Sequence, residues 1–248
     1  MDALILAAGY GSRLAALSPS KPLARVCGMP LIEIGVRQAM AAGVTRAVVV
    51  TGHLAGELEA FLAGLALRLD LPIETERLSD WSRPNGLSVL AGARRISGDY
   101  LLVMADHMFE TSLLRRLLDR RGTDSGVTLA IDRRCDSPLV DPEDATWVRT
   151  GPGGAIEAIG KTLAAHDAID CGAFLATPEL AAAIAAAIDG GAAGSVSDGM
   201  QRLADGGRAA TMDVGEAWWL DVDDPRAHAL AEAEAPARIE ALADPSRA

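Results

Sequence analysis

Two glycines and two basic residues follow the first apolar run of the chain. The segment LAAGYGSRLAALSPSKPL places Gly9 and Gly11 directly after that run, with Arg13 and Lys21 beyond them. Glycines at the end of a strand allow backbone N–H groups to close on a phosphate without a Cβ in the way. A dinucleotide-binding loop would need a third glycine where Leu14 stands, and the Gly-Lys-Ser/Thr of a Walker A loop is absent. The spacing therefore favours a phosphate-binding loop of another kind, with a glycine turn carrying solvated Arg13 and Lys21 as the alternative.

Lysine occupies only two of the 23 basic positions of the chain, Lys21 and Lys161. Codon bias with two accidental lysines would explain this pattern without any function. The other interpretation is that these two positions need a compact ammonium group, which the planar fork of arginine does not replace. We favour the second interpretation, because both lysines fall in segments that other signals single out.

Three aspartates could supply a metal site. Asp106 ends the run LLVMAD, and Asp221 and Asp223 end the run AWWLDVD. Two polyanions that meet at close range need a cation, and Mg²⁺ prefers a few carboxylate oxygens together with phosphates and water. An aspartate at a strand end is also a common turn residue or helix cap. His107 has no second histidine at a suitable spacing, which argues against a transition-metal site.

The composition limits the partners of the chain. Its 248 residues include 23 Lys plus Arg and 34 Asp plus Glu, which gives a net charge of −11. Such a surface repels nucleic acids and anionic membranes, so an anionic ligand would need a local basic pocket. No apolar run is long enough to cross a bilayer, and the apolar start lacks the basic leader of a signal peptide. The scattered Cys27, Cys135 and Cys171 indicate free thiols in a cytoplasmic protein.

The elements that must position these residues alternate between strands and helices in the first half of the chain. Such alternation, with short connections, is typical of a parallel sheet wound from right-handed β-α-β units. We therefore predict one α/β domain over residues 1–248, with a Rossmann-like, mixed and mostly parallel sheet flanked by helices. The expected strands are 3–8, 46–53, 72–77 and 99–106, and the expected helices are 30–43, 55–69, 85–96 and 111–121.

The pattern changes near residue 126 to β-like segments with a Gly-Pro-Gly-Gly turn. We assign about 1–125 to a nucleotide-binding half, about 126–225 to an acceptor-binding half, and 226–248 to a C-terminal helix and tail. The expected β-like segments are 126–133, 145–160, 169–177, 209–215 and 217–225, and the expected helices are 178–188, 196–207 and 225–243.

The pattern L-A-A-G-x-G-x-R-L, followed by S-K-P-L, resembles the nucleotidyltransferases that make activated sugars and polyols from a nucleoside triphosphate. The resemblance implies a GT-A-like fold and an attack of an acceptor phosphate on the α-phosphorus, with loss of pyrophosphate. It implies catalytic roles for Arg13 and Lys21, and Mg²⁺ held by Asp106 and Asp221, with Asp223 as a near alternative. The residues that it implies in nucleotide binding are Leu6, Ala7, Ala8, Gly9, Gly11, Asn85, Gly86, Ser88 and Ala105.

Two further segments carry weaker signals. In the family, the position of RPNGLSVLAGA helps to recognise the base, and Asn85 and Gly86 would supply an amide and a close approach. Asn-Gly is also an ordinary turn pair, so both interpretations stand. The segments IGK and DAIDCGAF place Lys161, Asp170 and Gly172 where the resemblance implies acceptor binding, with a satisfied strand-end carboxylate as the alternative for Asp170.

A finer resemblance is to the CTP:inositol-1-phosphate cytidylyltransferases. It rests on ADHMF, IDR with the following EDAT, IGK, DAIDCGAF and SVSDGMQRLA, in this order between residues 104 and 204. It implies transfer of CMP from CTP to inositol 1-phosphate or a similar polyol phosphate. The alternatives are a sugar-1-phosphate enzyme that uses UTP or dTTP, a phosphocholine nucleotidyltransferase, and an inactive nucleotide-sugar-binding sensor. Some relatives are fused to a membrane-embedded transferase that is not evident here, so we expect a separate membrane CDP-alcohol transferase to use the product.

Overall fold

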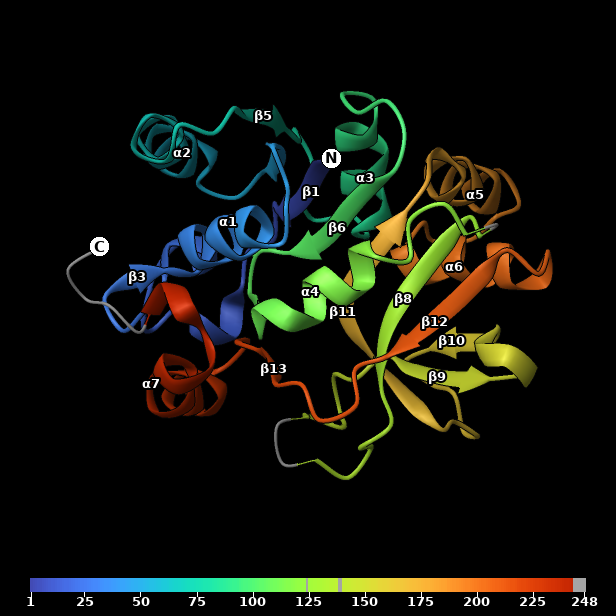
Figure 1. The fold of residues 1–248 in the computed structure, drawn as a ribbon. Helices are drawn as coiled ribbons and strands as arrows, with labels where there is room; N and C mark the ends of the chain where they lie inside the picture. Colours follow the sequence, from blue (N-terminus) through green and yellow to red (C-terminus); the bar gives the residue numbers. More distant parts are fainter. Residues whose placement is uncertain (124, 138–139, 243–248) are drawn as a thin grey trace.

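A nine-stranded mixed sheet forms the centre of the molecule in the computed structural model (Figure 1). The structure describes residues 1–123, 125–137 and 140–242. The main path of the sheet is β10-β9-β11-β6-β1-β4-β5, and β8 pairs with both β11 and β12. The strands are β1 (Asp2–Ala7), β4 (Arg46–Thr51), β5 (Ile73–Arg77), β6 (Tyr100–Met104), β8 (Val127–Asp132), β9 (Trp147–Thr150), β10 (Ile156–Gly160), β11 (Ala168–Ala176) and β12 (Ala209–Asp213).

The order of the strands creates a switch point beside β1. From β1 the chain moves outward through β4 to β5 and then returns to β6 on the opposite side of β1, and all these pairs are parallel. Ligands of open α/β sheets bind outside the carboxyl ends of the strands at such a point. Among the described strands of this sheet, only β10 and β11 run against the others. The predicted mixed, mostly parallel α/β fold is confirmed.

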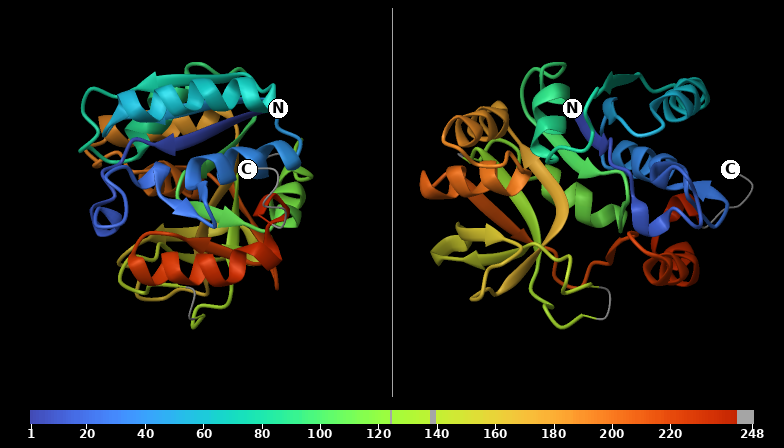
Figure 2. Two further views of the ribbon diagram at one scale, coloured as in Figure 1. Left: turned by 90° about the vertical axis from the view of Figure 1, so that its left-hand side faces the viewer. Right: turned by 180° about the vertical axis from the view of Figure 1, so that it is seen from behind.

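Helices cover both faces of the sheet (Figure 2). One face packs against α1 (Leu31–Ala41), α2 (Ala55–Leu69) and α4 (Thr111–Leu118), and the other against α3 (Gly86–Ala93), α5 (Pro178–Asp189) and α6 (Val196–Asp205). In β1, Ala3, Ile5 and Ala7 belong to the first core cluster, whereas Leu4 and Leu6 belong to the second. A strand buried on both faces reads as a continuous apolar run, which explains the start of the sequence.

A third apolar cluster lies beside the sheet and ties the C-terminal region to the N-terminal loop. It contains Leu14, Met108, Leu220 and Ala231. These residues come from the loop after β1, from the two-stranded sheet of β7 (His107–Phe109) and β13 (Trp219–Asp221), and from α7 (Pro225–Arg238). The hairpin of β2 (Arg25–Val26) and β3 (Met29–Pro30) completes the cluster, and Figure 1 shows α7, in red, beside these blue segments.

The predicted elements are present, with differences at their ends. The last helix was expected over 225–243 but ends at Arg238, followed by a 3-10 turn at Glu240–Leu242. The expected tail beyond residue 242 lies outside the described residues. Strand β13 falls within the expected segment 217–225, but β2, β3 and β7 are not among the predicted elements, because strands of two or three residues show no periodicity. None of the helices in the described ranges combines the length and the hydropathy that a membrane span requires.

Candidate active site

A hollow opens at the carboxyl ends of β1 and β6, at the switch point of the sheet. It consists of two adjoining cavities of about 360 and 290 Å³, which share Leu6, Gly9, Arg13, Asp106 and Asp223. We call the two cavities together the hollow. Its walls come from the loop after β1, the start of α3, β11, the segment before β9, and the start of α7.

All but one of the residues that the sequence points to line this hollow. The exception is Gly86, where an added Cβ would lie 2.3 Å from the carbonyl oxygen of Gly194 and 3.0 Å from Ile184 Cγ2. This glycine therefore allows α3 to approach α5 and the loop before α6, away from the hollow. The roles of the others stay predictions, but the structure brings these residues together: Leu6, Ala7, Ala8, Gly9, Gly11, Arg13, Lys21, Asn85, Ser88, Ala105, Asp106, Lys161, Asp170, Gly172, Asp221 and Asp223.

Gly11 and Lys21 fit against each other. Gly11 has a left-handed φ of 63°, and a Cβ there would lie 2.4 Å from Lys21 Cβ. Lys21 is 7% exposed, and its Nζ lies 2.5 Å from Asp106 Oδ2 and also pairs with Asp223. At Gly9, by contrast, an added Cβ would meet nothing within 4 Å. Gly11 thus makes room for the lysine stem, whereas the backbone at Gly9 is open to a ligand.

Arg13 and Lys161 share a carboxylate partner. Arg13 lies 2.5 Å from Asp144 Oδ2 and 3.7 Å from Asp141 Oδ2, and it also pairs with Asp223. Asp144 pairs with Lys161 through its other oxygen. The sequence analysis singled out neither Asp141 nor Asp144, because the acidic run DPEDAT gives no sign of a distant partner such as Arg13. Each cation that is expected to bind phosphate therefore carries a carboxylate partner here.

The pairing of β7 with β13 brings His107 opposite Asp221. His107 Nδ1 lies 2.8 Å from Asp106 Oδ1 and 3.7 Å from Asp221 Oδ1. Burial lowers the pKa of His107, but the charges of Asp221 and Asp106 outweigh burial and raise it to about 9. Burial raises the pKa of Asp221 to about 7, against the effect of His107. Asp221 Oδ1 is buried and has no hydrogen-bond partner among the described residues.

Two sets of side chains lie close enough to hold one cation. The first is Asp106, His107 and Asp221, and the second is Asp144, Asp221 and Asp223, with the ligand atoms of each set within 4.8 Å of one another. Asp221 belongs to both sets. Its buried oxygen without a donor and the surrounding carboxylates fit a hard cation such as Mg²⁺. Asp106 and Asp221 raise the pKa of His107, which disfavours the neutral imidazole that binds metals, so the carboxylates are the better ligands.

The prediction of a basic pocket is wrong, because most charged residues that line the hollow are acidic. Its described basic residues are Arg13, Lys21, Lys161 and Arg226. That expectation considered only the charge of an anionic ligand, whereas a ligand that arrives with metal ions, or that carries many hydroxyl groups, suits carboxylates. Seven aspartates outnumber the basic residues, namely Asp106, Asp141, Asp144, Asp170, Asp221, Asp223 and Asp224.

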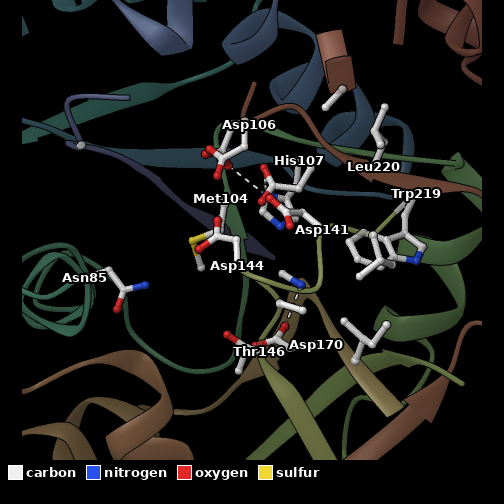
Figure 3. Close-up of a pocket in the computed structure, with 18 of the residues that line it drawn as sticks. Asn85, Met104, Asp106, His107, Asp141, Asp144, Thr146, Asp170, Trp219 and Leu220 are labelled. Atoms are coloured by element: carbon white, nitrogen blue, oxygen red, sulfur yellow. Dashed lines mark hydrogen bonds and ion pairs between the residues drawn. The ribbon is translucent and has the colours of Figure 1, made fainter. Parts of the chain in front are cut away.

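Asp170 faces the hollow from an irregular part of β11. The register of β11 against β8 shifts between Asp170 and Phe174, and Asp170 Oδ1 accepts a 2.7 Å hydrogen bond from Gly172 N. Gly172 has a φ of 75°, and a Cβ there would lie 2.4 Å from His107 Cδ2. Burial raises the pKa of Asp170 to about 6, against the hydrogen bond from Gly172. Figure 3 shows Asp170 and Thr146 across the hollow from Asp106, with Asn85 at one end.

Comparison with known proteins identifies the family of this chain. Residues 3–169 match the family described as the MobA-like NTP transferase domain. The chain belongs to this family. The fold agrees with that of the inositol-1-phosphate CTP transferase from T. maritima, with a TM-score of 0.79 at 22% identity over 93% of this chain and 94% of that chain. A UDP-glucose pyrophosphorylase gives a TM-score of 0.77 at 18% identity over 93% of this chain and 96% of that chain.

Two curated relatives share more of the sequence. A "Bifunctional IPC transferase and DIPP synthase" of Rubrobacter xylanophilus is 37% identical over 94% of this chain and 51% of its own length. A protein of the same name from Aquifex aeolicus is 28% identical over 90% of this chain and 49% of its own length. The chain therefore spans about half the length of these relatives.

The matched range of the family ends before several residues that complete the hollow. Asp221, Asp223 and Arg226 all lie beyond residue 169, and they reach the hollow through β13 and the start of α7. Arg226 carried no signal in the sequence, since one arginine in an arginine-rich chain does not stand out. The C-terminal fifth of the chain thus belongs to the candidate site as much as the N-terminal loop does.

Proposed function

We propose that this chain is a Mg²⁺-dependent nucleotidyltransferase that moves CMP from CTP to inositol 1-phosphate, or to a similar polyol phosphate, and releases pyrophosphate. The observation that carries the proposal is the meeting of Lys21 with Asp106 and Asp223 at the switch point, beside the glycine loop. A cation for phosphate and carboxylates for a metal ion are combined there in one place. The names of the bifunctional relatives and of the T. maritima structure support the choice of substrates.

The nucleotide would enter along the loop after β1. Backbone N–H groups near Gly9, together with Arg13 and Lys21, would hold the triphosphate in the smaller cavity. The nucleoside would lie toward Asn85 and Ser88, which line the larger cavity. Asn85 Oδ1 already accepts a 3.0 Å hydrogen bond from Val196 N, so its amide NH₂, directed toward the hollow in Figure 3, can donate to the base.

The acceptor would occupy the opposite part of the larger cavity. Lys161 can pair with its phosphate once it releases Asp144, and Asp170 can accept hydrogen bonds from its hydroxyl groups. Carboxylates on this wall suit a polyol, because each hydroxyl donates a proton that a carboxylate oxygen accepts. This assignment accounts for the acidic lining better than a second phosphate-rich ligand would.

The reaction needs positioning and charge neutralisation more than proton transfer. An oxygen of the acceptor phosphate bonds to the α-phosphorus while the bond from that phosphorus to the β-phosphate oxygen breaks. The nucleophile is already largely anionic, since the second pKa of a phosphate is about 6, so no general base is required. Bound Mg²⁺ would neutralise the phosphate oxygens, with Asp106, Asp221 and Asp223 as its ligands. Arg13 and Lys21 would hold the departing pyrophosphate and align the α-phosphorus.

The setting of the reaction is part of the same proposal. Cys27, Cys135 and Cys171 are free thiols in the structure, which suits a reducing cytoplasm. The product would be a CDP-alcohol, and a separate membrane CDP-alcohol transferase would consume it.

Pyrophosphate release tests the proposal directly. The assay combines CTP, UTP, ATP, GTP or dTTP with inositol 1-phosphate, glucose 1-phosphate or phosphocholine, with Mg²⁺ or with EDTA. We expect release with CTP and inositol 1-phosphate, and none in EDTA. Release only with UTP or dTTP and glucose 1-phosphate would replace the inositol assignment with a sugar one. Nucleotide binding without release from any pair would identify a sensor.

A further inference from the structure

The four tryptophans of the chain lie in different environments, and the partly buried Trp147 stacks on His166, with ring centroids 4.0 Å apart. Trp218 and Trp219 are 3% and 4% exposed, and their indole N–H groups donate to Glu234 at 2.8 Å and to Asp132 at 2.7 Å. They are therefore committed to the core. Trp81 is 37% exposed and Tyr10 is 46% exposed, and these are the two large aromatic side chains that the described part of the chain presents to solvent.

These two exposed rings meet at one place, with His53 between them. The ring centroids of Tyr10 and His53 lie 4.6 Å apart, those of His53 and Trp81 5.0 Å apart, and those of Tyr10 and Trp81 6.0 Å apart. We call Tyr10, His53 and Trp81 the aromatic rim. Its members come from the loops that follow β1, β4 and β5 at the carboxyl ends of these strands, which is the side of the sheet where the hollow opens.

Trp81 stands at the tip of a short turn. Asp80 Oδ1 accepts hydrogen bonds from Ser82 N at 3.2 Å and from Ser82 Oγ at 2.6 Å, so the carboxylate closes a loop around Trp81. Leu78 N donates to Thr51 O at 2.8 Å, which ties the start of the segment to the end of β4. These hydrogen bonds fix the backbone on both sides of Trp81, whose indole lies on the surface.

Gly52 brings this turn against the loop after β1. A Cβ at Gly52 would lie 2.6 Å from Ala8 O and 2.6 Å from Trp81 Cβ, so only a glycine allows the contact. Ala8 lines the hollow, and so does Asn85, which ends the Trp81 segment. Tyr10 lies between Gly9 and Gly11, which also line it. The aromatic rim therefore continues the nucleoside end of the hollow, away from Asp170.

We infer that the aromatic rim binds the nucleobase, with the base stacked on the indole of Trp81 and flanked by Tyr10. This inference rests on the proposed function. Of the two substrates, only the nucleotide carries a flat aromatic ring, whereas a polyol phosphate such as inositol 1-phosphate offers hydroxyls, phosphate and a puckered C–H face. A flat base has the larger contact with exposed aromatic rings and binds them by stacking. The phosphates would then reach the loop glycines beside Tyr10.

Binding of CTP and of inorganic tripolyphosphate, each with Mg²⁺, separates the base from the phosphates. Trp81→Ala keeps the Cβ that packs on Gly52, and we expect it to weaken CTP binding on the order of ten- to a hundredfold. Tripolyphosphate binding should not change, because that ligand has no base. Trp81→Phe, which restores a ring, should recover most of the CTP affinity. Leu67→Ala, at an 86% exposed residue of α2, is the matched control and should leave both ligands unaffected.

The outcomes distinguish this inference from the function on which it rests. If wild-type protein binds CTP and Trp81→Ala binds it equally well, the aromatic rim has no role in base binding. If wild-type protein binds neither ligand, the proposed function fails as well. Acrylamide quenching gives a second readout, because stacked CTP should shield Trp81 in wild-type protein, and the shielding should be clearly smaller in Trp81→Phe, which keeps Trp147 and Trp219. Unchanged quenching of the wild type by saturating CTP would also overturn the inference.

Discussion

Asp132, which bonds the indole of Trp219, and Asp221, two residues after Trp219 in β13, lie in environments that differ in their donors. Asp132 accepts hydrogen bonds from the side chain and backbone N–H of Arg134 and from Trp219 Nε1, all between 2.7 and 3.2 Å. Burial opposes its charge, but these donors outweigh burial and lower the pKa of Asp132. Asp221 has a buried oxygen without a donor, and burial raises its pKa to about 7.

From this difference we infer that Asp132 stabilises the fold, whereas Asp221 binds a ligand. A buried charge with several donors stabilises the folded state, whereas one without donors costs stability and persists only where something else uses it. Perturbed carboxylates in a cavity are typical of functional sites. Asp132 should therefore matter for stability and Asp221 for activity, and the predictions below test this contrast.

The largest effect is expected from Asp221→Asn. It removes the charged group that both candidate metal sets share, so Mg²⁺-dependent pyrophosphate release should fall by a factor on the order of a hundred or more. The free energy of unfolding should change little, because losing a carboxylate whose buried oxygen has no hydrogen-bond donor offsets losing its ion pair with His107. Pyrophosphate release measures the activity and urea unfolding measures the stability, with Asp132→Asn as the matched control. Full activity of Asp221→Asn would remove the basis of the contrast.

Lys21→Ala and Lys21→Arg should each lower turnover by a factor on the order of a hundred. Arginine should fail because the stem of Lys21 passes under Gly11, where an added Cβ would already lie 2.4 Å away, and its planar head does not fit there. Steady-state kinetics of both variants, with circular dichroism to confirm folding, measures this effect. Near-normal turnover of Lys21→Arg would show that any positive charge is sufficient at this position.

Asp132→Asn should lower the free energy of unfolding by about 2 kcal/mol, because it weakens charge-assisted hydrogen bonds to Arg134 and Trp219. Its turnover per folded molecule should match that of the wild type. Urea unfolding monitored by tryptophan fluorescence measures the change. A loss of turnover in the folded variant, with unchanged stability, would reverse the roles of the two aspartates.

The smallest effect is a pH dependence of that stability difference. The folded-state pKa of Asp132 is below its ordinary value of 3.8, so its charged form stabilises the protein fully at pH values above the unfolded-state pKa. This contribution is lost as the pH falls through the folded-state pKa. The gap in unfolding free energy between wild type and Asp132→Asn should therefore be constant near neutrality and shrink below about pH 4. A gap that widens toward acid would contradict the lowered pKa.

Much of the site was predictable where its residues are neighbours in the chain. Gly9, Gly11 and Arg13 stand within one loop, and Asp106 lies two residues after a strand that the apolar run LLVM predicts. Asp144 could not be predicted in the same way. It meets Arg13 across 131 positions of sequence, through an acidic run that looks like an ordinary solvated loop. The expected basic pocket failed for the same reason, since the pairing of its cations with carboxylates is a long-range property.

The sequence by itself determined the alternation of strands and helices, the continuous apolar β1, and the glycine loop with its arginine, because periodicity and glycine content are local properties of a chain. Only the tertiary structure decided that Asp221 faces His107, that the stem of Lys21 fills the space of a missing Cβ, and that Trp81 joins Tyr10. These contacts depend on how distant segments pair and pack. The free energy of such packing depends on contacts between segments from the whole chain, so it cannot be predicted from any short stretch of residues.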